Sequence, residues 1–183
     1  MKKIVLLLLI LLSASAAFAA KPFRSGVYVN AKVGAMRVDM KRDGERKDDV
    51  VFPFAFALGL RIRHFRIEAE YNFATTAKRD NYEQQTDYVS GQVYYDIPFK
   101  TPIRPFVNFG MGRHSTQVKE KNVFKDTRRG WAWNLGGGVT WAVSNAVNID
   151  LGYRYLNIGD LKTKVGTVKT KHHFAYIGWR YVF

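Results

Sequence analysis

The chain contains no cysteine, and beyond its first twenty residues it has no apolar run of membrane-spanning length. Without cysteine, the fold cannot rely on the disulfides that often hold small exported domains together. Without a long apolar run, it cannot cross a membrane with a helix, which needs ~20 such residues. Yet 47% of the residues are hydrophobic and 15% are aromatic. These residues must therefore be distributed over short segments held by backbone pairing and burial.

The first residues have the organisation of a secretory signal peptide. Lys2 and Lys3 precede an apolar run over residues 4–12, and an A-x-A sequence follows at Ala17–Ala19. The apolar run is about half the ~20 residues of a spanning helix, which argues against a retained anchor. We therefore expect residues 1–19 to be a cleaved signal peptide and residues 20–183 to form one domain. An exported chain rich in aromatic residues but without hydrophobic helices is either a soluble periplasmic protein or an outer-membrane barrel.

Apolar and polar residues alternate through eight segments of the mature chain. The segments are 27–35, 52–62, 65–73, 88–99, 103–111, 131–143, 147–155 and 173–183. Each is close to the ~10 residues of a tilted membrane-spanning strand. Short connections at 63–64, 100–102 and 144–146 alternate with long charged ones around 37–50, 74–87, 113–129 and 157–171. This pattern predicts an all-β fold, an eight-stranded antiparallel up-and-down transmembrane β-barrel with short periplasmic turns and long extracellular loops.

The tight turns predict the register of the strands. They set Ile62 opposite Phe65 and place small residues opposite long inward charges, as with Glu68 opposite Gly59, Glu70 opposite Ala57, and Arg154 opposite Gly136. The inward face then carries charges of both signs: Arg61, Arg66, Glu68, Glu70, Asp96, Asp150, Arg154 and Arg180.

Charges removed from water are costly unless they are paired, so we expect this inward set to form a hydrogen-bonded network. The interior of an eight-stranded barrel is just wide enough for side chains to fill. The sequence therefore favours a plugged core, with a narrow channel as the alternative.

Outward aromatic residues fall near the strand ends, where the two aromatic girdles of a membrane barrel lie. The periplasmic girdle is predicted to contain Phe65, Tyr95, Phe99, Trp141, Trp179, Tyr181 and Phe183. The outer girdle is predicted to contain Phe52, Phe54, Tyr71, Phe73, Trp131, Trp133, Tyr153 and Tyr155.

Four stretches carry a resemblance to a known family: the opening at 27–34, the glycines of 136–139, Gly152–Tyr155, and the ending Gly178–Phe183. Through them the mature chain resembles the opacity-protein and OmpA/OmpX-like outer-membrane β-barrel domains. The resemblance implies the outer membrane of a Gram-negative bacterium and a terminal Phe183 that the outer-membrane assembly machinery recognises. The resemblance predicts the architecture but not the activity, because adhesins and membrane stabilisers share this architecture.

The spacing of histidine and serine does not predict an enzyme. His114 and Ser115 are adjacent, so on a strand they point to opposite faces, whereas the lipid A deacylases that the chain resembles use a His and a Ser two residues apart. His172 and His173 would diverge in the same way and make a poor metal site. We expect solvated histidines at the rim, no catalytic residues, no cofactor and no metal. A lipid-modifying enzyme is the less favoured alternative.

The third and fourth long segments are basic. Their cations are Arg113, Lys119, Lys121, Lys125, Arg128, Arg129, Lys162, Lys164, Lys169 and Lys171. Against three acidic residues they hold +7 of the +12 net charge of the mature chain. We expect the fourth segment to form a hairpin with Val165 opposite Lys169.

These cations are suited to contact outer-membrane lipid and lipopolysaccharide, or to bind a host or matrix polyanion. No nucleic-acid-reading motif accompanies them, so nucleic acid is not expected as the physiological target. The sequence thus predicts a non-catalytic outer-membrane protein with a structural or adhesin-like surface role.

Overall fold

The computed structural model describes residues 24–42, 45–73, 77–79, 82–120, 124–163 and 166–183. The predicted signal peptide lies outside these ranges. No helix in the described part of the chain has the length and apolar character of a membrane-spanning segment.

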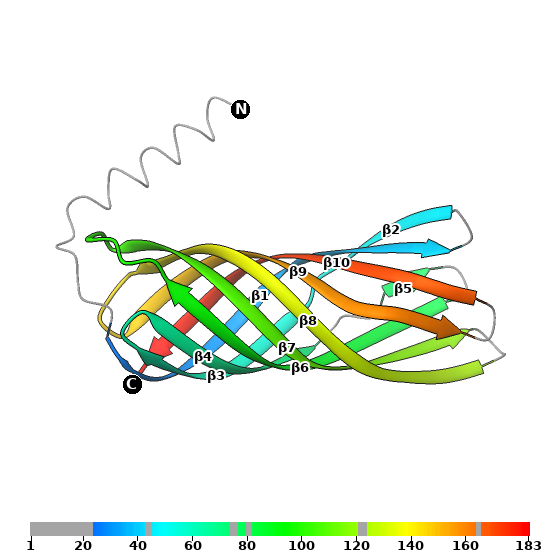
Figure 1. Ribbon diagram of the computed structural model, residues 1–183, viewed down its shortest axis with the longest axis horizontal. Helices are drawn as coiled ribbons and strands as arrows, with labels where there is room; N and C mark the ends of the chain where they lie inside the picture. The colour runs from blue at the N-terminus through cyan, green and yellow to red at the C-terminus, as the bar shows by residue number, and fades with distance from the viewer. Residues whose placement is uncertain (1–23, 43–44, 74–76, 80–81, 121–123, 164–165) are drawn as a thin grey trace, which may run out of the picture.

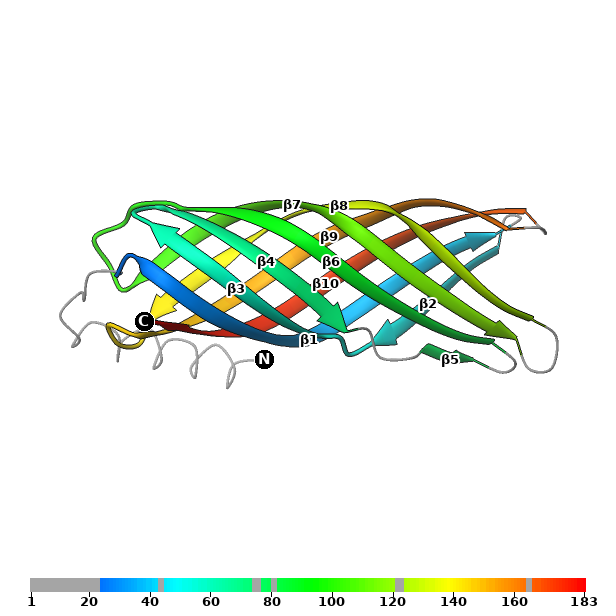
Figure 2. The ribbon, with the colours of Figure 1, turned by 90° about the horizontal axis from the view of Figure 1, so that it is seen from below.

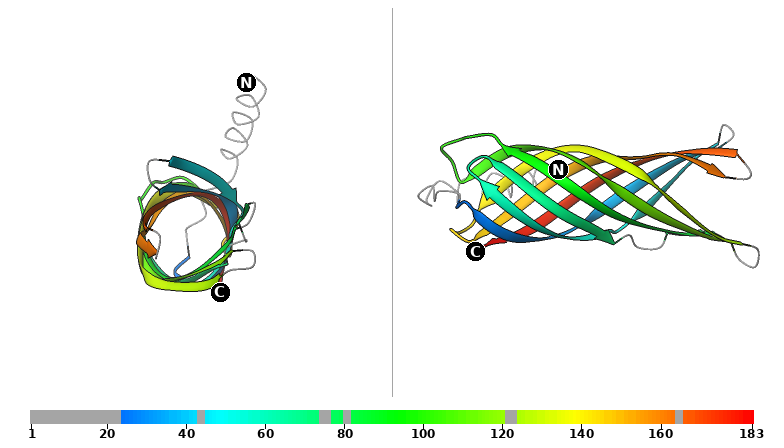
Figure 3. Two further views of the ribbon diagram at one scale, coloured as in Figure 1. Left: turned by 90° about the vertical axis from the view of Figure 1, so that its right-hand side faces the viewer. Right: turned by 60° about the horizontal axis from the view of Figure 1, so that its bottom comes forward.

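The described residues form a sheet of ten strands. They are β1 (Gly26–Arg42), β2 (Glu45–Val51), β3 (Phe54–Ile62), β4 (Phe65–Phe73), β5 (Ala77–Arg79), β6 (Tyr82–Asp96), β7 (Ile103–Glu120), β8 (Phe124–Ala142), β9 (Val147–Thr163) and β10 (Gly166–Val182). Neighbouring strands are antiparallel, and β10 returns to pair with β1. The sheet therefore closes into a barrel, seen along its axis in the left view of Figure 3.

The closed wall has eight antiparallel strands because two of them are interrupted. β2 and β3 pair with β1 in one continuous register and are separated at Phe52 and Pro53. Proline has no backbone N–H to donate to a ladder, which explains the break. β4 and β5 both pair with β6, with the register shifted by one residue between them. The predicted eight-stranded up-and-down barrel is confirmed, with finer divisions (Figure 1).

The two ends of the barrel differ (Figure 2). At one end, which we call the turn end, lie the tight turns and the carboxy-terminus. At the other, which we call the hairpin end, β1–β2, β6–β7, β7–β8 and β9–β10 continue as paired strands. Much of the four long segments predicted as loops is therefore paired sheet.

The predicted register holds near the turn end. Ile62 pairs with Phe65, Glu68 lies opposite Gly59, and Arg154 lies opposite Gly136. Two details of the prediction were wrong, and the first is the end of a strand. β6 ends at Asp96, before Pro98, instead of at Phe99.

The second wrong detail is the pairing within the hairpin of β9 and β10. Lys169 lies opposite Asp160 rather than Val165, and the register shifts between Lys169 and Lys171. The observed pairing sets opposite charges across the two strands, which stabilises a hairpin.

Burial along the strands is reversed relative to a soluble protein. β3 alternates exposed and buried residues over its whole length, with Leu58 59% exposed and the next inward charge, Arg61, 1% exposed. The outward side chains are valine, leucine, isoleucine and aromatic residues on every wall strand. A polar interior and an apolar exterior are typical of a barrel in a lipid bilayer.

Candidate functional site

The eight inward charged residues predicted from the sequence all lie inside the barrel, each no more than 2% exposed. They come from β3, β4, β6, β9 and β10, so strands distant in sequence supply one interior cluster. The structure joins them into two linked groups, described here as the lumen network.

The first group surrounds Glu68 and Glu70. Arg154 Nη1 donates to Glu70 Oε1 at 2.5 Å. Lys32 Nζ is 2.5 Å from Glu68 Oε2 and also contacts Glu70. The hydroxyl of Tyr94 accepts from Lys32 at 2.9 Å and from Arg154 at 2.8 Å. Lys32 of β1 is thus shared between the two carboxylates, and Glu70 also pairs with Arg154 of β9.

Lys32 is missing from the predicted set, although it forms ion pairs with two of its members. Lys32 lies on the same face of β1 as Tyr28 and Asn30, which are four and two residues before it. The two-residue periodicity of a strand would therefore have placed it inside the barrel. With Lys32 included, the lumen network contains five cations and four anions.

The second group lies nearer the turn end, around Asp96 and Asp150. Arg61 Nη2 is 2.7 Å from Asp96 Oδ2, and Arg66 bridges Asp96 at 2.8 Å and Asp150 at 3.1 Å. Arg180 approaches Asp150 at 3.4 Å. The chain of ion pairs therefore crosses the barrel from β3 to β10.

Asn30 connects the two groups. Its amide nitrogen donates to Glu68 Oε1 at 3.2 Å and to Asp150 Oδ2 at 3.5 Å. Tyr28 donates to the same Glu68 oxygen at 2.9 Å. The network thus occupies the middle of the lumen with paired charges and hydrogen-bonded polar groups.

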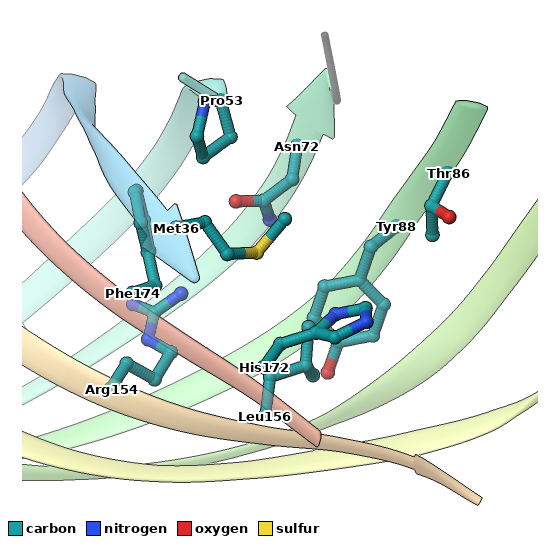
Figure 4. A pocket seen from close by; sticks show the side chains of 9 residues that line it. All are labelled: Met36, Pro53, Asn72, Thr86, Tyr88, Arg154, Leu156, His172 and Phe174. Atoms are coloured by element: carbon teal, nitrogen blue, oxygen red, sulfur yellow. The ribbon is translucent and has the colours of Figure 1, made fainter. Parts of the chain in front are cut away.

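Above the lumen network, towards the hairpin end, lies a cavity of about 30 Å³ (Figure 4). Its lining includes Met36, Tyr88, Leu156, His172 and Phe174. This volume has room for a water molecule or two and is far below the several hundred Å³ typical of a small-molecule site.

The histidines correct one prediction. His114 and His172 were expected at a solvated rim, but both point inward and are 3% and 1% exposed. They are buried because β7 and β10 continue well beyond the predicted strand ends. His114 Nδ1 lies 3.2 Å from Thr116 Oγ1, while Ser115 is on the opposite face and less buried, as adjacent strand residues must be.

The basic residues lie at the hairpin end. Arg113, Arg129 and Lys171 are exposed, and the Arg113 guanidinium lies 5.1 Å from the centre of the Trp131 ring. The backbone register sets Lys119 opposite Lys125 and Lys41 opposite Lys169. Lys121 and Lys164 fall outside the described residues.

Two basic residues remain, and the structure places their backbones on strands of the same hairpins. Arg128 is on β8 and Lys162 is on β9. At the other end, Phe183 faces outward and its backbone N–H donates to Val27 at 2.9 Å.

Comparison with known proteins identifies the architecture. The sequence matches the family described as outer membrane protein beta-barrel domain over residues 4–181. It is 26% identical over 92 residues to the outer membrane protein PagN of Salmonella typhimurium. That match covers 45% of this chain and 38% of PagN, so the chain spans well under two thirds of that relative.

Two solved structures share the fold. Neisserial surface protein A is 24% identical, with a TM-score of 0.71 over 87% of this chain and 98% of that one. Ail, the attachment invasion locus protein of Yersinia pestis, solved with the heparin analogue sucrose octasulfate, is 14% identical. Its TM-score is 0.52 over 85% of this chain and 99% of that one.

Proposed function

Because the chain belongs to the family of outer membrane protein beta-barrel domains, we propose that it is a non-catalytic surface protein whose basic hairpins bind sulfated or phosphorylated polyanions. It is a protein of the outer membrane of a Gram-negative bacterium. In such barrels the longer connections are extracellular, so the hairpin end faces the outside of the cell. The observation that carries the proposal is the concentration of unbalanced positive charge there.

The register intensifies that charge. Lys119 and Lys125 lie directly opposite each other on β7 and β8, as do Lys41 and Lys169 on β1 and β10, while on their other sides Lys119 faces Glu83 and Lys169 faces Asp160. Like charges in opposite positions destabilise a pair of strands. A bound polyanion would relieve this repulsion, so the arrangement favours binding of many negative charges at once.

A relative of the same fold supports the choice of ligand class. The Ail structure contains a heparin analogue, sucrose octasulfate. The low identity means that Ail and this chain share a fold, so sulfated sugars are proposed here mainly because of the hairpin charges.

The geometry also bears on the two alternatives. His114 and Ser115 point to opposite sides of the wall, so a direct dyad of these two does not form. The lumen network crosses the path that ions would take through a channel. Planar-bilayer recordings of the purified barrel test the channel directly, and we expect no stable conductance.

Heparin binding by the refolded barrel in detergent tests the proposal. Changing Lys119, Lys125 and Lys169 to Gln should weaken binding about tenfold, because three ion pairs with the polyanion, at about 0.5 kcal/mol each, would be lost. The matched control changes three exposed cations near the turn end, Arg24, Arg63 and Lys100, to Gln. Equal losses in both variants would show a response to overall charge and contradict a site on the hairpins.

A further inference from the structure

A chain of four polar side chains lies on the outer face of the wall, where β9, β10 and β1 adjoin. The Tyr153 hydroxyl is 2.5 Å from His173 Nδ1. His173 Nε2 is 3.8 Å from Asp39 Oδ2, and Asp39 Oδ1 accepts from Arg37 Nε at 3.1 Å. We call these residues, together with Lys171, the rim array. Neither the lumen network nor the hairpin lysine pairs include the four linked side chains.

The register places the rim array at the upper boundary of the apolar wall. His173 lies opposite Tyr155 on one side and Arg37 on the other, and Lys171 lies opposite Asp39. The rings of Tyr155 and His173 are 5.4 Å apart, and Tyr155 is 5.8 Å from Trp133. Aromatic residues of this kind mark the level of lipid headgroups.

Directly below the array, towards the turn end, two neighbouring outward side chains are small. Ala175 lies opposite Ala35 across β10 and β1, and both are exposed. The next outward pair towards the turn end is Ile177 and Val33, which are 48% exposed each. Cations thus stand above a pair of small apolar side chains, with larger aliphatic side chains below them.

We propose that the rim array binds a phosphate-bearing lipid of the outer leaflet, with an acyl chain lying over Ala35 and Ala175. Arg37 and Lys171 would supply positive charge to the phosphate, and the Tyr153 hydroxyl and the His173 ring would supply hydrogen-bonding groups. This goes beyond polyanion binding by the hairpins, because the ligand and the surface are different.

The charges of the array suit this ligand. The Arg37 side chain is 54% exposed, while the Asp39 side chain is 14% exposed and contacts both Arg37 and His173. Asp39 is therefore placed to orient these two groups. The array itself has two cations, Arg37 and Lys171, and the one carboxylate of Asp39, while the register sets Asp48 of β2 opposite Asp39 on its other side.

The position of the cations, directly above the lipid-facing wall, favours a lipid over a soluble anion. The chain is an outer-membrane protein, so the wall below the array faces lipid acyl chains. Basic side chains next to an anionic lipid surface contribute about 1 kcal/mol each. An anion without an acyl chain would use the cations but leave the apolar surface of the two alanines uncovered.

Native mass spectrometry of the barrel in detergent tests the proposal with three probes: diphosphorylated lipid A, the same lipid A with its phosphates removed, and inorganic phosphate. The double variant Arg37→Gln, Lys171→Gln should bind diphosphorylated lipid A at least about tenfold more weakly. Ala175→Leu, which places a larger side chain under the proposed acyl chain without changing charge, should weaken it as well. Dephosphorylated lipid A and inorganic phosphate should each bind poorly to the unaltered barrel.

Lys100→Gln is the control, because Lys100 is an exposed cation near the turn end, away from the rim array and from the basic hairpins. It should keep full binding of diphosphorylated lipid A. An equal loss in this control, or tight binding of the dephosphorylated lipid, would overturn the proposal. Full binding by the folded double variant would do the same. Migration on unheated and heated gels establishes that each variant is folded.

Discussion

The lumen and the hairpins use the same charged residue types in opposite ways. In the lumen network five cations meet four anions, and the eight residues predicted there are no more than 2% exposed. In the two basic hairpin segments ten cations meet three anions, and the register even sets lysines opposite lysines. Enclosed charges must be matched, because leaving one unpaired is strongly destabilising. Solvated charges need no match, so their excess is available for recognition.

Regularity follows the same division. Near the turn end, β3 and β4 pair without interruption from Ile62–Phe65 to Phe54–Phe73. Towards the hairpin end the wall is broken at Pro53 and its register shifts between Lys169 and Lys171. Inside a bilayer every backbone group must find a partner within the protein, whereas above it water can satisfy the groups that a break leaves unpaired.

The largest effect is expected from opening the lumen network. Glu70→Ala would leave Lys32 and Arg154 facing each other without the carboxylate that both contact. We expect a loss of about 3–5 kcal/mol in the free energy of unfolding, measured by urea titration in lipid vesicles. Lys119→Ala on a hairpin is the comparison and should change this free energy little. An unchanged midpoint for Glu70→Ala would indicate a wet, screened lumen and would favour the channel alternative.

A smaller effect on the free energy of unfolding than that of Glu70→Ala is expected when a glycine on the inner face of the wall is replaced by alanine, with a glycine on its outer face as the comparison. Gly59 faces the ring of Tyr28 so closely that an added methyl group would collide with it, whereas at Gly91 an added methyl group would meet nothing within 4 Å. Gly59→Ala should therefore cost about 1–3 kcal/mol through overpacking, and Gly91→Ala should be nearly neutral. Equal stabilities in the same urea titration would show that the interior is loosely packed near Tyr28.

The inward set was predictable because side chains of a strand alternate strictly between two faces. Which charges pair was not. Arg66 and Asp150 are 84 residues apart and meet through the interior. Their contact depends on barrel diameter and side-chain reach, which strand periodicity does not specify.

The burial of His114 and His172 was missed for a different reason. Both lie near the hairpin end, where the strands rise above the apolar wall and their outer face meets water instead of lipid. The apolar–polar alternation that marks a membrane strand therefore fades, while the backbone pairing continues. Strand boundaries read from alternation accordingly stop short of the structural ones.

The salt dependence of heparin binding tests most directly whether the hairpin charges serve recognition while the lumen charges serve stability. The Debye length falls from about 30 Å at 0.01 M salt to about 3 Å at 1 M, so exposed charges are screened strongly and enclosed pairs much less. The heparin affinity of the unaltered barrel should fall steadily over this range, and the variant with Lys119, Lys125 and Lys169 changed to Gln should show a shallower slope. An affinity that ignores salt, or a variant that keeps the full slope, would contradict this assignment of the hairpin charge.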